Sequence, residues 1–595
     1  MTVFFSGIFL LLLWQPQLGL VSLPVFLPLL NFSPWTGWLI VDEFDLLVLA
    51  VVAAGYFRKQ MDGVKLHYGS VFFLLLSIVA LLVVRGANDL AMQDLNWFSG
   101  YTTPLNAFRV GKSLLWAVLL FPLVVQAGKV SQPDKSKEGF FCACLLGSFW
   151  VVLAVFWERA FYPGLLNIST PYRTVALFWE MHLGGAALDA YLVLIAPLLV
   201  WAWRTTVSQP RRLVLGVFIL AFVYVCLTTF SRGVFGAIAG SIILLGALLA
   251  WRRVKGRQAL QGVSPTSLII LFFVALEIVL LLGADSFMSK RLAASERDFG
   301  QRMQHWEQGV GLLKTPDDWL FGIGLGKLPA RLTQGEAGLA VSGTSYWHED
   351  TGQRSMVITG PDGSNNAQEL GGLYALSQRV DLISGQRYRF AMDVHSEQDL
   401  EMLIQVCAQH LLFPARCQYR TMRVKSGEWE RLETSLSGYP FKARFWQSVG
   451  HGIFFLSVLT PGTKVEVTNL NLTVGTGNLL HNARFLEEGA GWFPAAFSYF
   501  LPWHIDNLYL EILIETGLVG LFLSLAVVFL VVRRLFLAYA QGNALAPYFI
   551  SCIAGLMALG LVVSVLDMPR VATLFGLFLV WAWWSGSGAW RKKRV

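Results

Sequence analysis

The sequence predicts a mainly α-helical, polytopic membrane protein of about twelve transmembrane helices, with an all-β domain inserted outside the membrane. Apolar residues make up 55% of the chain and charged residues only 14%, a balance typical of multispanning membrane proteins. Apolar runs long enough to cross about 30 Å of hydrocarbon recur along the chain. One long stretch between two such runs alternates apolar and polar residues, which is the period of a half-buried strand.

The apolar runs give nine spans before this stretch and three after it. The first run contains Pro16, Pro24 and Pro28, so it is either one kinked helix or a shorter span with an interfacial piece. It lacks a basic n-region and a clear cleavage site, so we do not expect a cleaved signal peptide. The predicted spans are 3–30, 36–57, 68–86, 106–127, 139–158, 184–203, 212–229, 232–250, 265–284, 507–532, 546–565 and 570–588.

These runs divide the chain into five parts. The two membrane parts enclose a segment that we expect to begin with an amphipathic helix and a Gly-rich stretch, to continue as the β-domain, and to return to the membrane. The predicted parts are 1–284 (spans one to nine), 285–337 (amphipathic helix and Gly-rich segment), 338–477 (β-sandwich), 478–506 (return segment) and 507–595 (spans ten to twelve and a basic tail).

Basic residues indicate the orientation. The stretches "FRKQMDGVK", "GKVSQPDKSK", "RTTVSQPRR", "WRRVKGR", "VVRRL" and "RKKRV" occupy every second loop. Because cytoplasmic loops carry an excess of Lys and Arg, both termini are predicted to be cytoplasmic and 285–503 to lie outside. The net charge of +8 follows mostly from this bias, so the sequence does not call for a nucleic-acid partner.

The inserted segment reads as an antiparallel β-sandwich. Stretches such as "QRYRFAMDVHS" and "KVEVTNLNLTV" alternate apolar and polar residues between Gly, Asn, Asp and Pro. Cys407 and Cys417 are ten residues apart, and an oxidising compartment favours a hairpin disulfide between them. The other cysteines fall in predicted spans as buried thiols, and no Cys/His spacing indicates zinc, so we expect no metal site.

Three polar clusters are predicted on the outer side. In "LTTFSRGVFG" (227–236), Arg232 sits between two apolar runs beside Thr228, Thr229 and Ser231. An Arg at a membrane surface either anchors there by snorkelling or binds an anion, and the hydroxyl groups around it favour a phosphate.

The second cluster is a predicted amphipathic helix over 298–313 that carries Arg302, His305 and Trp306. The third is His504 and Asn507, three residues apart at the start of the tenth span. His takes and gives a proton near neutral pH, although a single His at a membrane edge is more often only hydrogen-bonded.

In this order "TTFSRG", "RMQHW…PDDWLFGIGLG" and "HIDNLYLEILIETGLVG" resemble the O-antigen ligase and O-antigen polymerase family of bacterial envelope enzymes. The resemblance covers roughly 160–335 and 500–565. It implies a GT-C-like glycosyltransferase of the bacterial inner membrane with its large loop in the periplasm. The donor would be a glycan on undecaprenyl diphosphate, and the acceptor a sugar hydroxyl on lipid A-core or on a growing polysaccharide. No metal, other cofactor or nucleotide sugar would be required.

Carried over residue by residue, the resemblance implies that Arg232 and Arg302 hold the donor diphosphate and that His504 is the base on the acceptor. Many members of the family have a second His two residues after the first. This chain has Asp506 there, which becomes the second candidate base. The supporting candidates are Asn507, Ser231, His305, Arg173 and Arg109, with Arg159, Glu180 and His182 ranked below them.

The stretch "LYALSQRVDLISGQRYRFAMDV" looks like the strand pair of jelly-roll carbohydrate-binding modules, and "LLHNARFLEEGAGW" like the start of another such unit. Sugar binding and a spacer or protein-interaction role both stay open. Trp347, Trp429 and Trp446 would stack on sugar rings or fill the core.

Other functions compete with glycosyl transfer to a glycan. A transporter or flippase of lipid-linked glycan predicts charges paired inside the helix bundle and an internal repeat. No repeat is visible, and the predicted polar clusters lie on one face, apart from the acidic stretch "VDEFD" (41–45). A protein O-oligosaccharyltransferase would share the donor but use a protein acceptor. A glycan-binding sensor or scaffold gives no reason for Arg232, Arg302 and His504 to share a face.

Overall fold

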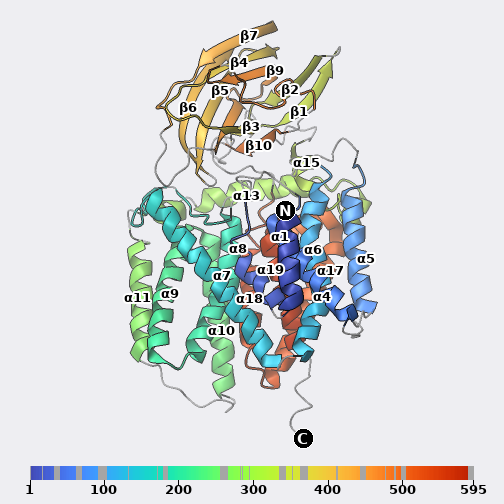
Figure 1. Ribbon diagram of the computed structural model, residues 1–595, viewed down its shortest axis with the longest axis vertical. Helices are drawn as coiled ribbons and strands as arrows, with labels where there is room; N and C mark the ends of the chain where they lie inside the picture. The colour runs from blue at the N-terminus through green and yellow to red at the C-terminus, as the bar shows by residue number, and fades with distance from the viewer. Residues whose placement is uncertain are drawn as a thin grey trace.

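The protein is described by a computed structural model of the 595-residue chain (Figure 1). The described residues are 2–16, 18–32, 40–61, 70–90, 103–130, 133–170, 172–178, 185–254, 265–281, 283, 286–293, 295–333, 343–350, 353–361, 373–410, 413–441, 451–475, 477–487, 491–496 and 504–586.

A bundle of helices forms one part of the molecule and a β-sandwich lies at one end of it (Figure 1). The largely buried helix α8 lies near the middle of the bundle (Figure 1) and packs against α18, α10 and α7. The bundle helices are α1 (Thr2–Trp14), α2 (Leu18–Phe26), α4 (Glu43–Met61), α5 (Ser70–Gly86), α6 (Asn106–Val130), α7 (Pro133–Phe161), α8 (Ala186–Thr205), α9 (Gln209–Thr228), α10 (Arg232–Val254), α11 (Pro265–Leu281), α17 (Leu508–Ala540), α18 (Ala546–Leu559) and α19 (Pro569–Ser585).

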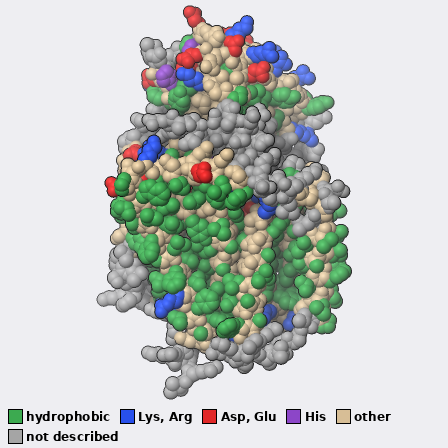
Figure 2. All heavy atoms as spheres, turned by 180° about the vertical axis from the view of Figure 1, so that it is seen from behind, with side chains coloured by type: hydrophobic (Ala, Val, Ile, Leu, Met, Phe, Trp, Pro, Cys, Tyr) green, Lys and Arg blue, Asp and Glu red, His purple; other side chains and the backbone are tan. Residues whose placement is uncertain are grey.

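Several of these helices are apolar enough to be embedded in a membrane. Hydrophobic side chains cover the body of the bundle, whereas most of the visible charged side chains lie over the sandwich (Figure 2). Within the described residues, six helices have the length and composition to cross a membrane. They are Asn106–Ala127, Lys137–Phe161, Ala186–Thr205, Gln209–Thr228, Arg232–Arg252 and Leu508–Ala540.

The other predicted spans correspond to helices that are shorter, apart from the 19-residue α4. The first predicted span, 3–30, is two helices, because α1 ends at Trp14 and α2 begins at Leu18, on either side of Pro16. The apolar helix α18 has 14 residues, fewer than a full span needs, whereas α19 has 17, at the lower limit of about 17. The tenth predicted span continues to Ala540 as the 33-residue helix α17, which is kinked at Gly517 (φ 69°).

The β-domain consists of two antiparallel sheets that enclose one apolar core. One sheet has the strand order β1-β2-β9-β4-β7 and is called here the far sheet; the other has the order β10-β3-β8-β5-β6 and is called the near sheet, because it faces the bundle (Figure 1). The strands are β1 (Ser345–Asp350), β2 (Gln353–Thr359), β3 (Tyr374–Asp381), β4 (Arg389–Ser396), β5 (Leu400–His410), β6 (Phe413–Val424), β7 (Gly427–Ser435), β8 (His451–Val458), β9 (Lys464–Thr473) and β10 (Phe493–Ala496).

The core of the sandwich follows the predicted alternation. In β9, Val465 and Val467 are buried between the sheets and, after a one-residue shift near Asn469, so are Leu470 and Leu472. Strand β10 pairs with β3, so the near sheet includes residues beyond the predicted range 338–477. Sequence alone gives little signal for a strand of only four residues.

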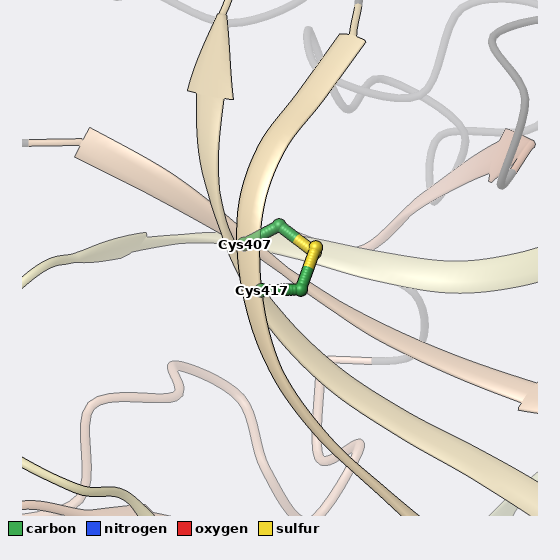
Figure 3. The surroundings of a disulfide bond; sticks show 2 residues. All are labelled: Cys407 and Cys417. Carbon is green, nitrogen blue, oxygen red and sulfur yellow. A yellow bond between two sulfur atoms is a disulfide. The ribbon is translucent and has the colours of Figure 1, made fainter. Parts of the chain in front are cut away.

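Cys407 and Cys417 lie directly opposite each other in the β5–β6 ladder and form the disulfide that the sequence predicts (Figure 3). The two strands form a hairpin, so residues ten apart in the chain are neighbours across the ladder. Cys407 is buried in the apolar cluster on the near sheet's outer face.

Short helices lie between the bundle and the sandwich. The predicted amphipathic helix is α13 (Ser295–Val310), which lies across the sandwich end of the bundle (Figure 1). Around it are α12 (Phe287–Ala293), α14 (Pro316–Phe321) and α15 (Leu328–Thr333), and the 3-10 helix η2 (Val565–Asp567) joins α18 to α19.

The segment 172–178 attaches the sandwich to the bundle. Val175 and Leu177 pack against Ala375, Ile453 and Phe455 on the outer face of the near sheet. The buried carboxylate of Glu158 on α7 holds this segment, because it accepts hydrogen bonds from Tyr172 Oη (2.7 Å), Ala176 N (2.7 Å) and Val175 N (3.1 Å).

Candidate functional site

The predicted base, His504, is buried against a carboxylate. Its side chain is 2% exposed, and its Nδ1 atom pairs with Oδ2 of Asp567 in η2. A carboxylate at Nδ1 stabilises the tautomer that carries its proton there, which leaves Nε2 as the ring atom able to accept a proton. This assignment of the proton follows from the hydrogen-bond geometry.

Arg109 holds the other side of the same carboxylate. From α6 it pairs with Asp567 Oδ1 through Nη2 and donates from Nη1 to the Asp567 carbonyl (2.9 Å). Its Nε donates to Asn106 Oδ1 (2.6 Å). Burial alone raises the pKa of Asp567, but the charges of Arg109 and His504 outweigh burial and lower that pKa to about 2. Arg109, Asp567 and His504 therefore form one buried cluster around the Asp567 carboxylate.

Helix α13 fixes the backbone on which His504 lies. The His504 carbonyl is 2.8 Å from His305 Nε2, and Trp306 Nε1 donates to the Ile505 carbonyl (2.8 Å). Asp506 has a positive φ of 49°, a conformation that Asp tolerates better than most residues. His305 and Trp306 thus act on the backbone of the 504–506 turn.

Asn507 is the N-cap of α17. Its Oδ1 accepts hydrogen bonds from the backbone N–H groups of Tyr509 (3.0 Å) and Leu510 (3.1 Å), and its Nδ2 donates to the Leu561 carbonyl (3.1 Å). These bonds fix the start of α17 directly after the turn that carries His504. They do not involve the imidazole.

Arg302 lies next to Asp506, the other candidate base. Arg302 Nη2 is 3.9 Å from Asp506 Oδ2, and both side chains are partly exposed. Arg302 Nη1 also donates to the Val562 carbonyl (3.1 Å). This guanidinium can contact solvent or a ligand while it stays hydrogen-bonded to the turn before η2.

Arg232 begins α10 near the same turn. Its Nη1 donates to the Arg291 carbonyl (2.8 Å). The next residue, Gly233, lies against Val562, since a Cβ placed on Gly233 would be 2.9 Å from Val562 Cγ2. The start of α10 and Arg302 are therefore both near Val562.

The hydroxyl groups near Arg232 are used within the protein. Thr228 Oγ1 and Thr229 Oγ1 donate to backbone carbonyls of α9, at 3.0 and 2.8 Å. Ser231 is buried. Arg173 donates from Nε to the Thr229 carbonyl (2.9 Å), and its Nη2 is 3.2 Å from Oδ2 of the buried Asp189. Arg173 therefore lies beside the turn before α10 and forms an ion pair with α8, and its role as a supporting residue of a glycan site stays a prediction.

Asp567 and Asp189 were missed by the reasoning from sequence. Each is a single acidic residue at or near the end of an apolar helix, and such residues are costly unless paired. That cost is the signal that could have identified them. Their partners, Arg109 and Arg173, were ranked only as supporting residues.

Some candidates lie elsewhere. Arg159, at the end of α7, is fully buried and donates from Nη2 to the Asn167 and Gly164 carbonyls. Trp347 is on β1 and packs against the core of the sandwich, and Trp429 is on β7 and exposed. Glu180, His182 and Trp446 lie outside the described residues. Within the described ranges, no group of three or more His, Cys, Asp or Glu residues is arranged to hold a metal ion.

No protein-family model matches the chain, and no curated protein shows significant sequence similarity to it. Among solved structures, one described as "CBM4 structure and function" matches 24% of this chain and 82% of its own, with 10% identity and a TM-score of 0.18.

Proposed function

We propose that this protein is a GT-C-like glycosyltransferase of the bacterial inner membrane, which moves a glycan from undecaprenyl diphosphate to an acceptor sugar hydroxyl on the periplasmic face. The observation that carries the proposal is the pairing of His504 with Asp567, which Arg109 fixes from the other side, at the end of the bundle that bears the sandwich. The proposal includes about twelve spans, a periplasmic position for 285–503 and a cytoplasmic C-terminus, because the last helix, α19, ends on the side of the bundle opposite the sandwich (Figure 1). Helix α1 begins at the sandwich end, so the predicted cytoplasmic N-terminus is not part of the proposal.

The acceptor is a neutral alcohol that must lose its proton as it attacks the donor sugar. In the proposed reaction, Nε2 of His504 takes this proton while the new glycosidic bond forms. The bond from the donor sugar to the diphosphate breaks, and the electron pair stays on the diphosphate. A positioned general base contributes about 10²–10⁴-fold to such a step. Because His504 is 2% exposed, the acceptor reaches it only when the neighbouring turn moves.

The leaving diphosphate needs fixed positive charge. Arg302, which is partly exposed, and Arg232, at the start of α10, both lie near the Val562 turn. Guanidinium groups bind phosphate oxygens through paired N–H donors, and charge placed in advance stabilises the departing anion. In the proposal, the diphosphate displaces Asp506 from Arg302.

A transporter of lipid-linked glycan is the second candidate, because of one observation. Ion pairs join elements of the bundle, and paired charges are part of what that function predicts: Lys112–Asp45, Arg109–Asp567 and Arg173–Asp189. Their acidic partners lie at or near helix ends. Such pairs also occur as structural elements of membrane proteins, so they do not decide between the two functions.

Reconstitution separates the candidates. Purified protein in liposomes would receive an undecaprenyl-diphosphate-linked repeat unit, with and without lipid A-core, and products would be resolved on a gel. A ladder without lipid A-core indicates a polymerase, and a shifted band only with lipid A-core indicates a ligase. Movement of the lipid-linked glycan between leaflets without any new glycosidic bond would contradict the transferase proposal and support the transporter.

A further inference from the structure

An open cavity with polar and apolar lining lies on the far sheet, on the side of the sandwich away from the helix bundle (Figure 1). It has a volume of about 470 Å³, within the range of roughly 300–1,000 Å³ that ligand sites occupy. Its walls come from β4, β7, β9 and the segment after β9. The polar residues that line it are Asp393, Arg431, Asn469, Asn471, Asn478 and Arg484. None of them was singled out from the sequence.

Hydrogen bonds hold one wall of the cavity in place. Asp393 on β4 accepts from Arg431 Nη1 (2.9 Å) and from Asn469 Nδ2 (2.5 Å). Arg431 also donates to the Asn469 carbonyl (2.9 Å). The cavity wall is therefore preorganised, and binding would not have to order these three side chains.

Asn469 occupies an irregular position in the sheet. The β4–β9 register shifts between Ala391 and Asp393, and Asn469 on the opposite strand has a positive φ of 48°. Bulges of this kind redirect side chains and are frequent next to functional sites. Here the irregularity turns the Asn469 amide toward Asp393 at the cavity wall.

Two groups at the cavity have no partner among the described residues. Asn471 lines the cavity, and its Oδ1 is buried without a hydrogen-bond partner among those residues. A buried acceptor of this kind is normally satisfied, and a rotation of the Asn471 amide would bring it to a donor in the cavity. Arg484 forms neither an ion pair nor a side-chain hydrogen bond with any described residue, whereas Arg431 beside the same cavity pairs with Asp393 and donates to the Asn469 carbonyl.

A flat aromatic surface adjoins this region. Trp429 precedes Arg431 by two residues on β7, so both side chains point to the same face of the sheet. Trp429 is 37% exposed and stacks on His395 of β4, with ring centroids 5.6 Å apart. An exposed Trp next to amide, carboxylate and guanidinium groups offers both an apolar surface and hydrogen bonds.

We propose that this cavity binds an oligosaccharide chain and that Arg484 gives it a preference for chains with carboxylate-bearing sugars. A sugar hydroxyl donates to Asn471 Oδ1, and a sugar carboxylate accepts paired N–H groups from Arg484. The proposal concerns binding only and does not depend on whether the bundle transfers glycans.

The test is equilibrium binding to the full-length protein in detergent. The acidic probes are hexasaccharides of galacturonate and of mannuronate, and the neutral probes are the same hexasaccharides with their carboxyl groups reduced to alcohols. The variants are Arg484→Ala and Asn471→Ala. The matched control is Arg423→Ala, because Arg423 is a highly exposed arginine on β6 of the other sheet.

We expect at least one acidic probe to bind more tightly than its reduced form, with the difference shrinking at high salt. Arg484→Ala should lower the affinity for the acidic probe about tenfold to a hundredfold, because a hydrogen bond to a charged group is lost. The affinity for the acidic probe should then be close to the affinity for its neutral form. Asn471→Ala should lower the affinity for both the acidic and the neutral form, whereas Arg423→Ala should change the affinity for neither.

Absence of binding by all four probes would overturn the proposal. Binding that neither Arg484→Ala nor Asn471→Ala alters would also overturn it, because the ligand would then be bound elsewhere. An unchanged melting temperature in the variants shows that any loss of binding is not a loss of folding.

Discussion

His504 owes its surroundings to residues that are far from it in the sequence. Asp567 lies between the last two helices and Arg109 on α6, yet both meet at one carboxylate beside the imidazole. Neither contact can be read from the motif around His504, because only the packing of the helices brings them together. The motif identifies the imidazole, and the fold supplies the group that orients it.

The first prediction concerns catalysis by His504. Replacing His504 with Ala should lower the rate of glycosyl transfer by about 10²–10⁴-fold, because the acceptor loses its base. The measurement is the initial rate of product formation in liposomes. His348→Ala on β1 is the control, since that histidine lies in the sandwich near Glu466. Equal rates for the two variants would show that His504 is not the base.

The second prediction concerns acid stability. The folded-state pKa of Asp567 is about 2, below its ordinary value of 3.8, because Arg109 and His504 outweigh its burial. A lowered pKa stabilises the folded state above the ordinary value, and this stabilisation, about 2 kcal/mol, is lost as pH falls from about 4 to about 2. The melting temperature of the wild type should fall over that range.

Asp567→Asn should lower stability at neutral pH by roughly 3–5 kcal/mol, because Arg109 loses its buried partner. The melting temperature of this variant should also fall less than that of the wild type between about pH 4 and pH 2. Parallel melting curves for the two proteins across that range would contradict the ion pairing of Asp567.

At the scale of elements, two glycines allow the α14–α15 connection to pack closely against the kink in α17. Gly322 and Gly517 have φ values of 74° and 69°. The kink leaves helix carbonyls available, and Ile323 N and Gly324 N donate to the Ile514 and Glu515 carbonyls (2.9 and 3.0 Å). A Cβ on either glycine would lie within 2.3 Å of backbone atoms of the opposite segment.

The third prediction is that Gly322→Ala and Gly517→Ala each destabilise the protein by at least about 2 kcal/mol, through the positive φ and the backbone contact together. Thermal unfolding in detergent measures the effect. Gly300→Ala on α13 is the matched control, because a Cβ there has nothing within 4 Å and should be neutral or slightly stabilising. Equal melting temperatures for all three variants would show that this close contact is absent.

The fourth prediction concerns the segment that attaches the sandwich. Glu158→Gln turns an amide N–H toward the backbone donors of Val175 and Ala176, so roughly 1–3 kcal/mol of hydrogen bonding is lost. Hydrogen exchange at these two amides should accelerate, whereas exchange in α8 should not. Glu433→Gln, at an exposed position on β7, is the control. Unchanged protection of Val175 and Ala176 would contradict the anchoring role of Glu158.

For the whole molecule, composition and periodicity predict the division into apolar helices and an inserted β-domain, because lipid and water impose different patterns on the side chains. The disulfide is predictable because a hairpin brings Cys407 and Cys417 together. The lengths of helices are less predictable: apolar runs also cover short helices such as α18, and Pro16 divides the first run. The pairing of Asp567 and the cavity around Asn471 depend on contacts between distant segments, so the sequence gives no pattern for either.

The most direct test of the central proposal is the release of undecaprenyl diphosphate in liposomes that contain the protein, a lipid-linked repeat unit and an acceptor glycan. The account predicts release coupled one-to-one to a new glycosidic bond, with both lost together in His504→Ala and in Arg302→Ala. Both reactions at wild-type rates in these variants, or transbilayer movement of the intact donor with no release, would contradict it.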